Sequence, residues 1–239
     1  DGPSLAQALA ASQLNNIVRL LDQDGFLQES WHPDAGSARA ISAEALADAM
    51  TALRGARASG YGGPRVDTAL ENGFRILDAG FLRPDGDYAA RISDAFGLEP
   101  GPKRLSVQLA VLRALLLEAE ADGGVETRAA AEALWARLES LWWDDDVGLW
   151  QPTLGLVDYR YSTALFARAL EAGRSAARAG LPQADVRLRR VAEALLTYGR
   201  LGETWLSGET DGAGDADGDG VPHFGGAGVP PVPADEVVF

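Results

Sequence analysis

Apolar residues recur along most of this chain with the spacing of one face of a helix. Leu105, Leu109, Leu112 and Leu116 stand at i, i+4, i+7 and i+11 and form one such stripe. Similar stripes occur before and after it, up to about residue 200. The pattern predicts helices at about 4–23, 42–59, 65–79, 102–121, 126–142, 159–179 and 183–200.

Residues that favour helix starts and stops stand near the ends of these predicted helices. Ser42 precedes one helix and is a plausible N-cap, because its hydroxyl oxygen can accept a backbone N–H of the first turn. The glycine-rich stretch 60–63 ends that helix. Pro64 and Pro182 occupy positions where a first-turn proline is favoured. These signals support the boundaries that the periodicity predicts.

A similar turn follows four of the predicted helices. Each turn places a glycine just before a large apolar residue, followed by a short stretch that could pair as a small hairpin. The four segments are "DGFLQESW" (24–31), "AGFLRPDGDY" (79–88), "VGLWQPTL" (147–154) and "GETWLSGE" (202–209). Two helices per unit of this length are typical of a repeat array, in which neighbouring units cover the apolar face that one hairpin leaves open.

The segment 141–170, "LWWDDDVGLWQPTLGLVDYRYSTALFARAL", resembles the α/α-toroid proteins, the group that holds six-hairpin glycosidases and N-acylglucosamine 2-epimerase-like enzymes. In it an outer helix ends, an aromatic turn follows, and an inner helix begins. The resemblance implies an all-α fold of consecutive α-hairpins. Six hairpins close such a toroid, whereas this chain holds about three and a half. We expect an incomplete toroid or arc, a fragment of a larger protein, or a half completed by another chain; an irregular helical bundle is the alternative.

The resemblance also implies a ligand rim, where the turns before the inner helices converge. Flat aromatic faces suit sugar rings, and paired carboxylates serve glycoside hydrolysis. The alternative is that the aromatic residues close the helix ends by packing. No pair of carboxylates stands out by spacing, so the catalytic residues stay unknown. The candidate rim residues are Trp31, Asp87, Trp150, Asp158, Tyr159 and Trp205.

Charge and composition exclude several classes of function. The net charge is −14, and Arg200 is the last basic residue, so nucleic acid is not an expected partner. The chain has no cysteine, which excludes thiolate metal sites and disulfides. No phosphate loop, dinucleotide motif or nucleophile elbow is present. No apolar run approaches the length of a membrane span.

The acidic segment near the C-terminus resembles the calcium loops of dockerins and thrombospondin type 3 repeats. Asp215, Asp217 and Asp219 alternate before a glycine, as at positions 1, 3, 5 and 6 of an EF-hand-type loop, and Val221 follows at the position whose backbone carbonyl binds the ion. The bidentate glutamate of that loop is missing, so the remaining ligands would be Asp211, Asp235, Glu236, Glu209 or water; the alternative is a solvated acidic linker. We therefore predict a weak Ca²⁺ site, with Kd of about 10⁻⁴–10⁻³ M. Such a site fills where calcium is abundant, which favours the periplasm or the cell exterior.

These observations divide the chain into a repeat domain over 1–205 and an acidic calcium-binding loop with an extended tail over 206–239. The three prolines after residue 229 forbid a helix there, and the apolar residues at 237–239 are expected to lie against the helical body or a partner. Two hypotheses follow. The chain is an extracytoplasmic calcium-binding helical-repeat module that binds a protein partner or the remainder of a larger assembly. Alternatively, it is a carbohydrate-active α/α-toroid enzyme, or part of one, with a structural calcium ion.

Overall fold

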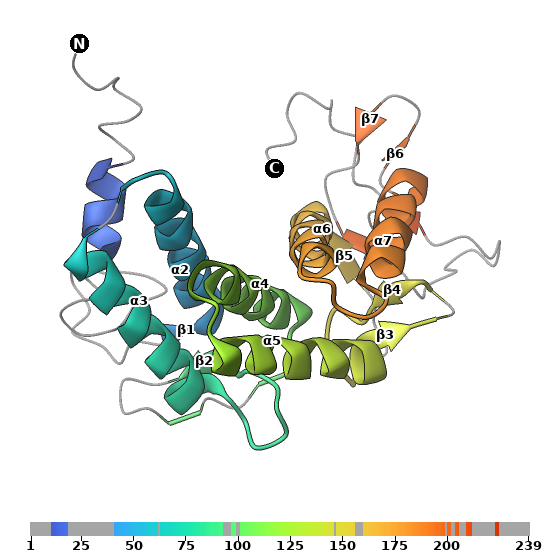
Figure 1. The fold of residues 1–239 in the computed structure, drawn as a ribbon. Coiled ribbons are helices and arrows are strands. Elements are labelled where there is room, and N and C mark those ends of the chain that lie inside the picture. Colours follow the sequence, from blue (N-terminus) through green and yellow to red (C-terminus); the bar gives the residue numbers. More distant parts are fainter. Residues whose placement is uncertain are drawn as a thin grey trace, which may run out of the picture.

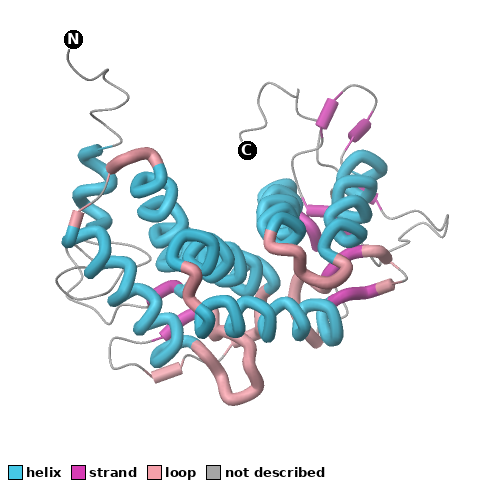
Figure 2. Tube along the Cα trace, viewed as in Figure 1, coloured by secondary structure: helices cyan, strands magenta, loops and turns pink. Residues whose placement is uncertain are grey.

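The described helices form an open arc (Figure 1). The computed structural model describes residues 11–18, 41–61, 63–92, 97–98, 101–145, 147–155, 160–198, 200–201, 204–205, 209–211 and 223–224; for residue 160 and from 198 onward it describes only the backbone. Helices dominate, and the strands are short pieces beside their ends (Figure 2). The predicted all-α fold of consecutive hairpins is confirmed.

The helices alternate between two layers. The inner row consists of α2 (Ala43–Ala58), α4 (Leu105–Asp122) and α6 (Thr163–Arg178), and α4 packs against both of its neighbours. The outer helices are α3 (Pro64–Ile76), α5 (Val125–Arg137) and α7 (Ala184–Tyr198), each packed on the inner helix before it. Residues 11–18 add a helical segment before α2. This alternation of inner and outer helices is the arrangement of an α/α toroid.

Local sequence signals start the inner helices α2 and α6 and end α4. Ser42 caps α2, since its Oγ accepts a hydrogen bond of 3.3 Å from the backbone N–H of Ala45. Ser162 caps α6 in the same way through the N–H of Leu165. Gly123 ends α4 in the left-handed conformation at φ 63°, where glycine has no steric penalty. The predicted cap at Ser42 is confirmed, and α7 begins two residues after Pro182.

Outer helices α3 and α5 end in the same unusual way. Each passes into one π-helical turn, η1 (Leu77–Phe81) and η2 (Leu138–Trp142). A small hairpin follows each turn: Leu82 bridges to Tyr88, and β3 (Trp143–Asp144) pairs with β4 (Leu149–Trp150). After α7, β6 (Arg200–Leu201) pairs with β7 (Thr204–Trp205). Hairpins therefore form at the second, third and fourth turn segments, and the first segment lies outside the described residues. Only the second hairpin follows its glycine as predicted; in the third and fourth, one strand precedes the glycine.

The segment after each outer helix also reaches back to the start of the preceding inner helix. β2 (Arg91–Ile92) pairs with β1 (Ile41–Ser42) before α2, and Thr153 bridges to Arg104 before α4. β8 (Glu209–Asp211) pairs with β5 (Arg160–Ser162) before α6, and β9 (His223–Phe224) adds to the same sheet. These pairings gather the turns at the N-terminal ends of the inner helices, on one rim. The β5–β8 pairing links the two predicted parts of the chain, 1–205 and 206–239.

The core lies between the two layers and is richest around α4. Ten residues of α4 are buried, among them Leu109, Leu112 and Leu116 of the predicted stripe. α2 contributes Leu46, Met50 and Leu53, and the outer helices contribute residues such as Leu70, Leu134 and Val191. Ser106, Arg113 and Glu120 share one face of α4, which looks into the hollow of the arc. Gln108, by contrast, is buried and forms hydrogen bonds with the backbone of Tyr88.

Candidate functional site

Asp87, a predicted rim residue, lies in the interior beneath the turn after η1. Its side chain has no exposed surface. Its carboxylate accepts two hydrogen bonds of 2.8 Å from Arg137, and one of 2.6 Å from Lys103. Burial alone would raise the pKa of Asp87, but the hydrogen bonds from these two cations hold it below its ordinary value. Asp87 therefore fixes the turn to α5 and to the segment before α4.

Trp150, a second predicted rim residue, is fully buried in an aromatic cluster. Its ring meets Trp135 and Trp143 edge to face, with centroid separations of 5.7 and 5.1 Å. Arg187 of α7 stacks on the Trp143 ring at 4.0 Å. The cluster joins α5, α7 and the β3–β4 hairpin, as the packing alternative for the aromatic residues describes. Neither Trp150 nor Asp87 reaches solvent in this arrangement.

The other predicted site residues fall mainly outside the described part of the chain. Trp31, Asp158 and Tyr159 lie outside it, and Trp205 is described only as backbone in β7. The candidate calcium ligands Asp215, Asp217, Asp219 and Val221 also lie outside it, whereas the backbone of Asp211 is part of β8. The register pairs Asp211 with His223, so the two ends of the segment that carries the calcium motif lie side by side at the rim.

Within the described residues, no group of three or more histidine or acidic side chains is placed to hold a metal ion. No described helix is long and apolar enough to cross a membrane. The predicted calcium site remains a prediction, because its residues fall outside both observations.

A polar cluster that the sequence did not single out lies at the N-terminal ends of the inner helices. Arg168 of α6 forms two hydrogen bonds, of 2.7 and 2.9 Å, with the Asp48 carboxylate of α2, and its Nη2 lies 3.0 Å from Glu44 Oε1. Ser106 of α4 donates a hydrogen bond of 2.8 Å to Glu44 Oε2. One residue from α4 and one from α6 thus meet two carboxylates of α2.

The cluster is open to solvent, unlike the pairing of Asp87. The side chains of Glu44 and Asp48 are 32% and 44% exposed, and that of Arg168 is 24% exposed. Partial burial opposes the charge of Arg168, but the hydrogen bonds with Asp48 and the nearby carboxylates raise its pKa above the ordinary value. The guanidinium therefore stays charged, and all three charged groups remain within reach of a ligand.

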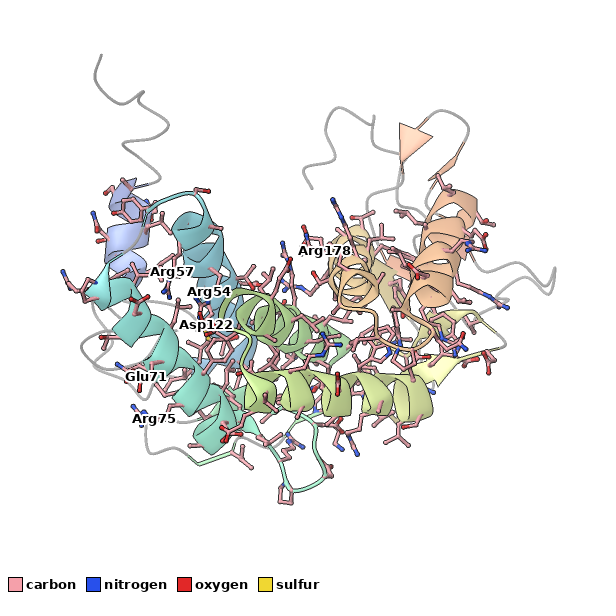
Figure 3. All side chains as sticks on the ribbon, in the orientation of Figure 1. Arg54, Arg57, Glu71, Arg75, Asp122 and Arg178 are labelled. Atoms are coloured by element: carbon pink, nitrogen blue, oxygen red, sulfur yellow. The ribbon has the colours of Figure 1, made fainter. Side chains whose placement is uncertain are left out.

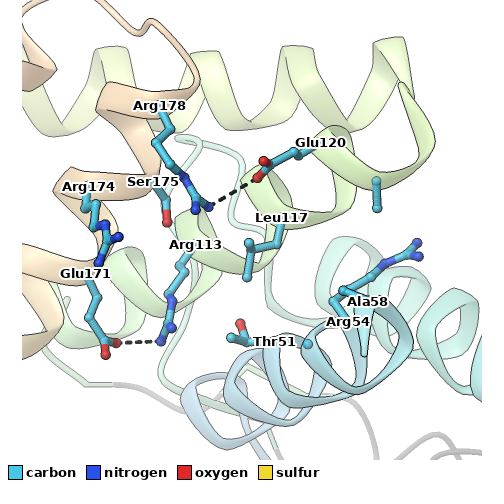
Figure 4. A pocket seen from close by; sticks show the side chains of 12 residues that line it. Thr51, Arg54, Ala58, Arg113, Leu117, Glu120, Glu171, Arg174, Ser175 and Arg178 are labelled. Carbon is cyan, nitrogen blue, oxygen red and sulfur yellow. Dashed lines mark hydrogen bonds and ion pairs between the residues drawn. The ribbon is translucent and has the colours of Figure 1, made fainter. Parts of the chain in front are cut away.

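The same face continues as a cleft toward the C-terminal ends of the inner helices (Figure 4). The cleft has a volume of about 600 Å³ and is lined by residues of α2, α4 and α6. Arg113 of α4 pairs with Glu171 of α6, and Arg178 pairs with Glu120 across the same two helices. Beside it, Arg54 is buried against Glu118 and Asp122 and ties α2 to α4.

A second cleft, of about 640 Å³, lies on the outer side between α5 and the turn before α7. Glu139 and Arg187 line it and pair at 2.8 Å. Burial raises the pKa of Glu139, and the nearby Arg187 opposes that rise. Gln183 stands at the edge of this cleft with a positive φ of 62°. The Trp135 indole N–H already donates to the Pro182 carbonyl oxygen, so the polar groups here mainly join the outer helices to each other.

Comparison with known proteins agrees with this arrangement at the level of the fold. No family model and no curated protein matches the sequence. Among solved structures, cellobiose 2-epimerase from Spirochaeta thermophila superposes with a TM-score of 0.66 at 15% identity, covering 86% of this chain and 59% of that one. An endoglucanase of glycosyl hydrolase family 8 from Klebsiella pneumoniae superposes with a TM-score of 0.64 at 15% identity, covering 87% of this chain and 65% of that one. Cellobiose 2-epimerase from Bacillus thermoamylovorans superposes with a TM-score of 0.62 at 11% identity, covering 77% of this chain and 50% of that one.

The fold is that of an α/α toroid. The chain spans about half to two thirds of the length of these structures, so it forms a partial toroid, as the count of hairpins predicts. A likeness at this level of identity shows the shared fold and does not carry over binding or catalytic residues. The candidate site on the concave face is therefore argued from the contacts of this chain's own residues.

Sequence reasoning missed the polar face because its residues look like an ordinary solvent-exposed helix surface. A signal was nevertheless present in α4, whose residues 109–117 are apolar apart from Arg113. Ser106, Arg113 and Glu120 recur there at intervals of seven residues, on one face of the helix. A polar stripe on a helix that is otherwise buried marks a face that must meet solvent or a ligand.

Proposed function

We propose that this chain is the saccharide-binding arc of a carbohydrate-active α/α toroid, and that the concave face of α2, α4 and α6 is its binding surface. The observation that carries the proposal is the polar stripe on α4, whose charged partners come from α2 on one side and α6 on the other. Ser106 lies at the N-terminal end of this stripe, beside Glu44, and Arg113 lines the cleft. The solved structures with this fold are named as epimerases and glucanases that act on sugars.

The polar cluster at the N-terminal ends of the inner helices, called the mouth from here on, suits hydroxyl-rich ligands. It consists of Glu44, Asp48, Ser106 and Arg168. Glu44 and Asp48 supply carboxylate oxygens that accept hydrogen bonds, and Arg168 supplies several N–H donors in a fixed plane. Sugar hydroxyls both donate and accept, so such a mixture of groups can satisfy them. Hydrogen bonds that involve charged groups are stronger than those between neutral groups. The arrangement therefore provides affinity and orientation for a saccharide.

We propose binding as the role of the described mouth residues, and assign none of them as catalytic. Glycoside hydrolysis places two carboxyl groups on opposite sides of the bond to be cleaved. Glu44 and Asp48 come from the same helix and contact the same guanidinium. Chemistry at this face would therefore draw on a further group, such as the predicted rim residues Asp158 and Tyr159, or on the part of a toroid that this chain does not supply.

The predicted calcium loop fits this proposal as a structural element of the rim. The pairing of β8 with β5 fixes the start of the acidic segment beside the N-terminus of α6, close to the mouth of the arc. A Ca²⁺ ion bound by Asp215, Asp217 and Asp219 would hold that segment in one conformation. Binding of a protein partner or of the remainder of a larger assembly, at the edges of the arc, is compatible with the same role. Location in the periplasm or outside the cell would supply both calcium and polysaccharide.

Electrophoresis in gels that contain soluble polysaccharides tests the proposal. We expect at least one of mixed-linkage glucan, xylan, mannan and polygalacturonate to retard the protein. Asp48→Ala should abolish most of the retardation. The matched control is Glu71→Ala on α3, whose side chain points away from the concave face in Figure 3. Equal retardation of the two variants, or no retardation by any of these polysaccharides, would refute the proposal.

A further inference from the structure

We infer that the cleft below the mouth takes an acidic saccharide, whose carboxylates are bound by Arg113, Arg174 and Arg178. The inference rests on the proposed function and adds to it the chemical class of the ligand. The three arginines come from α4 and α6 and gather on one side of the cleft (Figure 4).

The side chains that line the cleft carry a net positive charge, whereas the chain as a whole is negative. The sequence carries a net charge of −14, yet three arginines face two glutamates, Glu120 and Glu171, along this part of the concave face. Arg54 also lines the cleft, but it pairs with Glu118 and Asp122, two carboxylates that lie outside the lining. The side chains that line the cleft therefore carry more positive than negative charge on an acidic protein, and such a lining favours an anionic ligand.

These arginines are also free to change partners. The Arg178–Glu120 pair is exposed, with side chains 51% and 62% accessible, and the Arg113–Glu171 pair is 31% and 54% accessible. Exposed pairs of this kind contribute only about 0–1 kcal/mol, because solvent screens them. Within the described residues, Arg174 has neither an ion pair nor a hydrogen bond. A ligand carboxylate can therefore bind here without breaking a strong contact.

The C-terminal end of α6 explains only part of this charge. A helix C-terminus carries a partial negative charge and favours cations in the last turn, which accounts for Arg178. Arg113 stands in the middle of α4, where the helix dipole gives no such preference, and Arg174 already lies a full turn before the end of α6. Two of the three arginines are thus unexplained by the stability of the helices themselves.

The spacing of the arginines favours an extended anion over a compact one. Arg174 and Arg178 are four residues apart, which corresponds to about 6 Å along the helix axis. Arg113 lies on the neighbouring helix, level with Glu171. Guanidinium groups bind carboxylates in a planar, two-point geometry. Carboxylates repeated along an oligouronate chain match such a row, and the volume of about 600 Å³ lies within the range of small-ligand sites.

Calorimetric titration with a short oligogalacturonate tests the inference, with a neutral cello-oligosaccharide of the same length and inorganic phosphate as comparisons. We expect the oligogalacturonate to bind most tightly, and added sodium chloride to weaken its binding while leaving that of the neutral sugar unchanged. Arg174→Ala and Arg113→Ala should each weaken oligogalacturonate binding about tenfold, the usual scale for losing a charged hydrogen bond. Arg75→Ala on the outer helix α3 is the matched control and should change nothing.

Several outcomes would overturn the inference, and they separate it from the proposed function. If the neutral sugar binds as tightly as the oligogalacturonate and Arg174→Ala has no effect, the inference fails and the proposed function stands. Phosphate binding as tight as that of the oligogalacturonate would show a general anion site and would also overturn it. If neither sugar binds, the inference fails, and the gel assay with the four polysaccharides decides separately whether the proposed function stands. Arg174 lies on the surface of α6, so its replacement leaves the core intact and keeps the test decisive.

Discussion

Two clusters of arginine and carboxylate join elements of this protein, and they differ in access to solvent. At the rim, Asp87 is completely buried and shared between Arg137 and Lys103. On the concave face, Glu44 and Asp48 share Arg168, but both carboxylates remain about one third or more exposed. Asp87 can stabilise the fold and cannot touch a ligand. Glu44 and Asp48 add little stability and are open to a ligand, so the exposure of the carboxylates, and not the residue type, separates the two clusters.

The largest effect is expected at the buried cluster. Asp87→Ala leaves Arg137 and Lys103 without their shared carboxylate, and removing one partner of a buried ion pair costs about 3–5 kcal/mol in the free energy of unfolding. We expect a loss at the low end of this range, because the side chains of Arg137 and Lys103 are 24% and 21% exposed. Urea unfolding monitored by circular dichroism measures the loss. Asp85→Ala is the control, because Asp85 contacts the same Lys103 with a side chain that is 47% exposed. Equal losses for the two variants would show that burial does not distinguish these carboxylates.

Acid should remove the contribution of Asp87. Its pKa in the folded protein lies below the ordinary value of 3.8, so the unfolded chain takes up the proton first as the pH falls. The ionised carboxylate therefore stabilises the fold above about pH 4, and this stabilisation is lost as the pH drops through the folded-state pKa. Urea unfolding of the wild type and of Asp87→Asn at a series of pH values should show their difference narrowing below pH 4. A difference that stays constant over that range would contradict the assignment.

A third group of carboxylates, predicted from the sequence alone, should respond to calcium. If Asp215, Asp217 and Asp219 bind Ca²⁺ in the folded protein, a Ca²⁺ concentration of ten times Kd should raise the free energy of unfolding by about 1.4 kcal/mol. Asp217→Ala combined with Asp219→Ala should abolish the response and leave the helical circular dichroism unchanged. The melting temperature with calcium and with chelator, compared between the wild type and this double variant, measures the stabilisation by calcium. A melting temperature that is indifferent to chelator would assign the segment to an acidic linker.

The smallest effect on stability is expected at the open cluster. Arg168→Ala removes contacts with Asp48 and Glu44, and partly exposed pairs of this kind contribute about 0–1 kcal/mol. The unfolding midpoint in urea should therefore move little. A loss as large as that of Asp87→Ala would identify this cluster as structural and would remove the reason to place a ligand there.

Much of the fold could be predicted from the sequence, because its signals are local. The apolar stripe of α4 and the Ser42 cap each depend on residues of one continuous segment, and the structure confirms both. The glycine turns predicted the hairpins after α3, α5 and α7. The two π-helical turns were not predicted, because η1 and η2 continue the apolar pattern of the helices before them.

The site was harder to predict, because it depends on contacts between distant residues. Asp87 stood out in an exposed-looking turn, yet Arg137 and Lys103 cover it from elsewhere in the chain. Glu44 and Asp48 looked like an ordinary polar helix face, and only the packing of α6 against α4 brings Arg168 to them. A sequence pattern places a residue on a face, but the neighbouring helices decide whether that face is covered.

Saccharide titration of the two clusters tests the central claim most directly. The polysaccharide that retards the wild type is cut to short oligomers, and their binding to the wild type, Arg168→Ala, Asp85→Ala and Arg75→Ala is measured by calorimetry. If the ligand binds on the concave face, Arg168→Ala is the only one of these three variants that weakens binding, by about tenfold, and its unfolding midpoint stays close to that of the wild type. Binding of Arg168→Ala that equals the wild type, with any loss confined to the rim or to α3, would contradict a ligand site on the concave face.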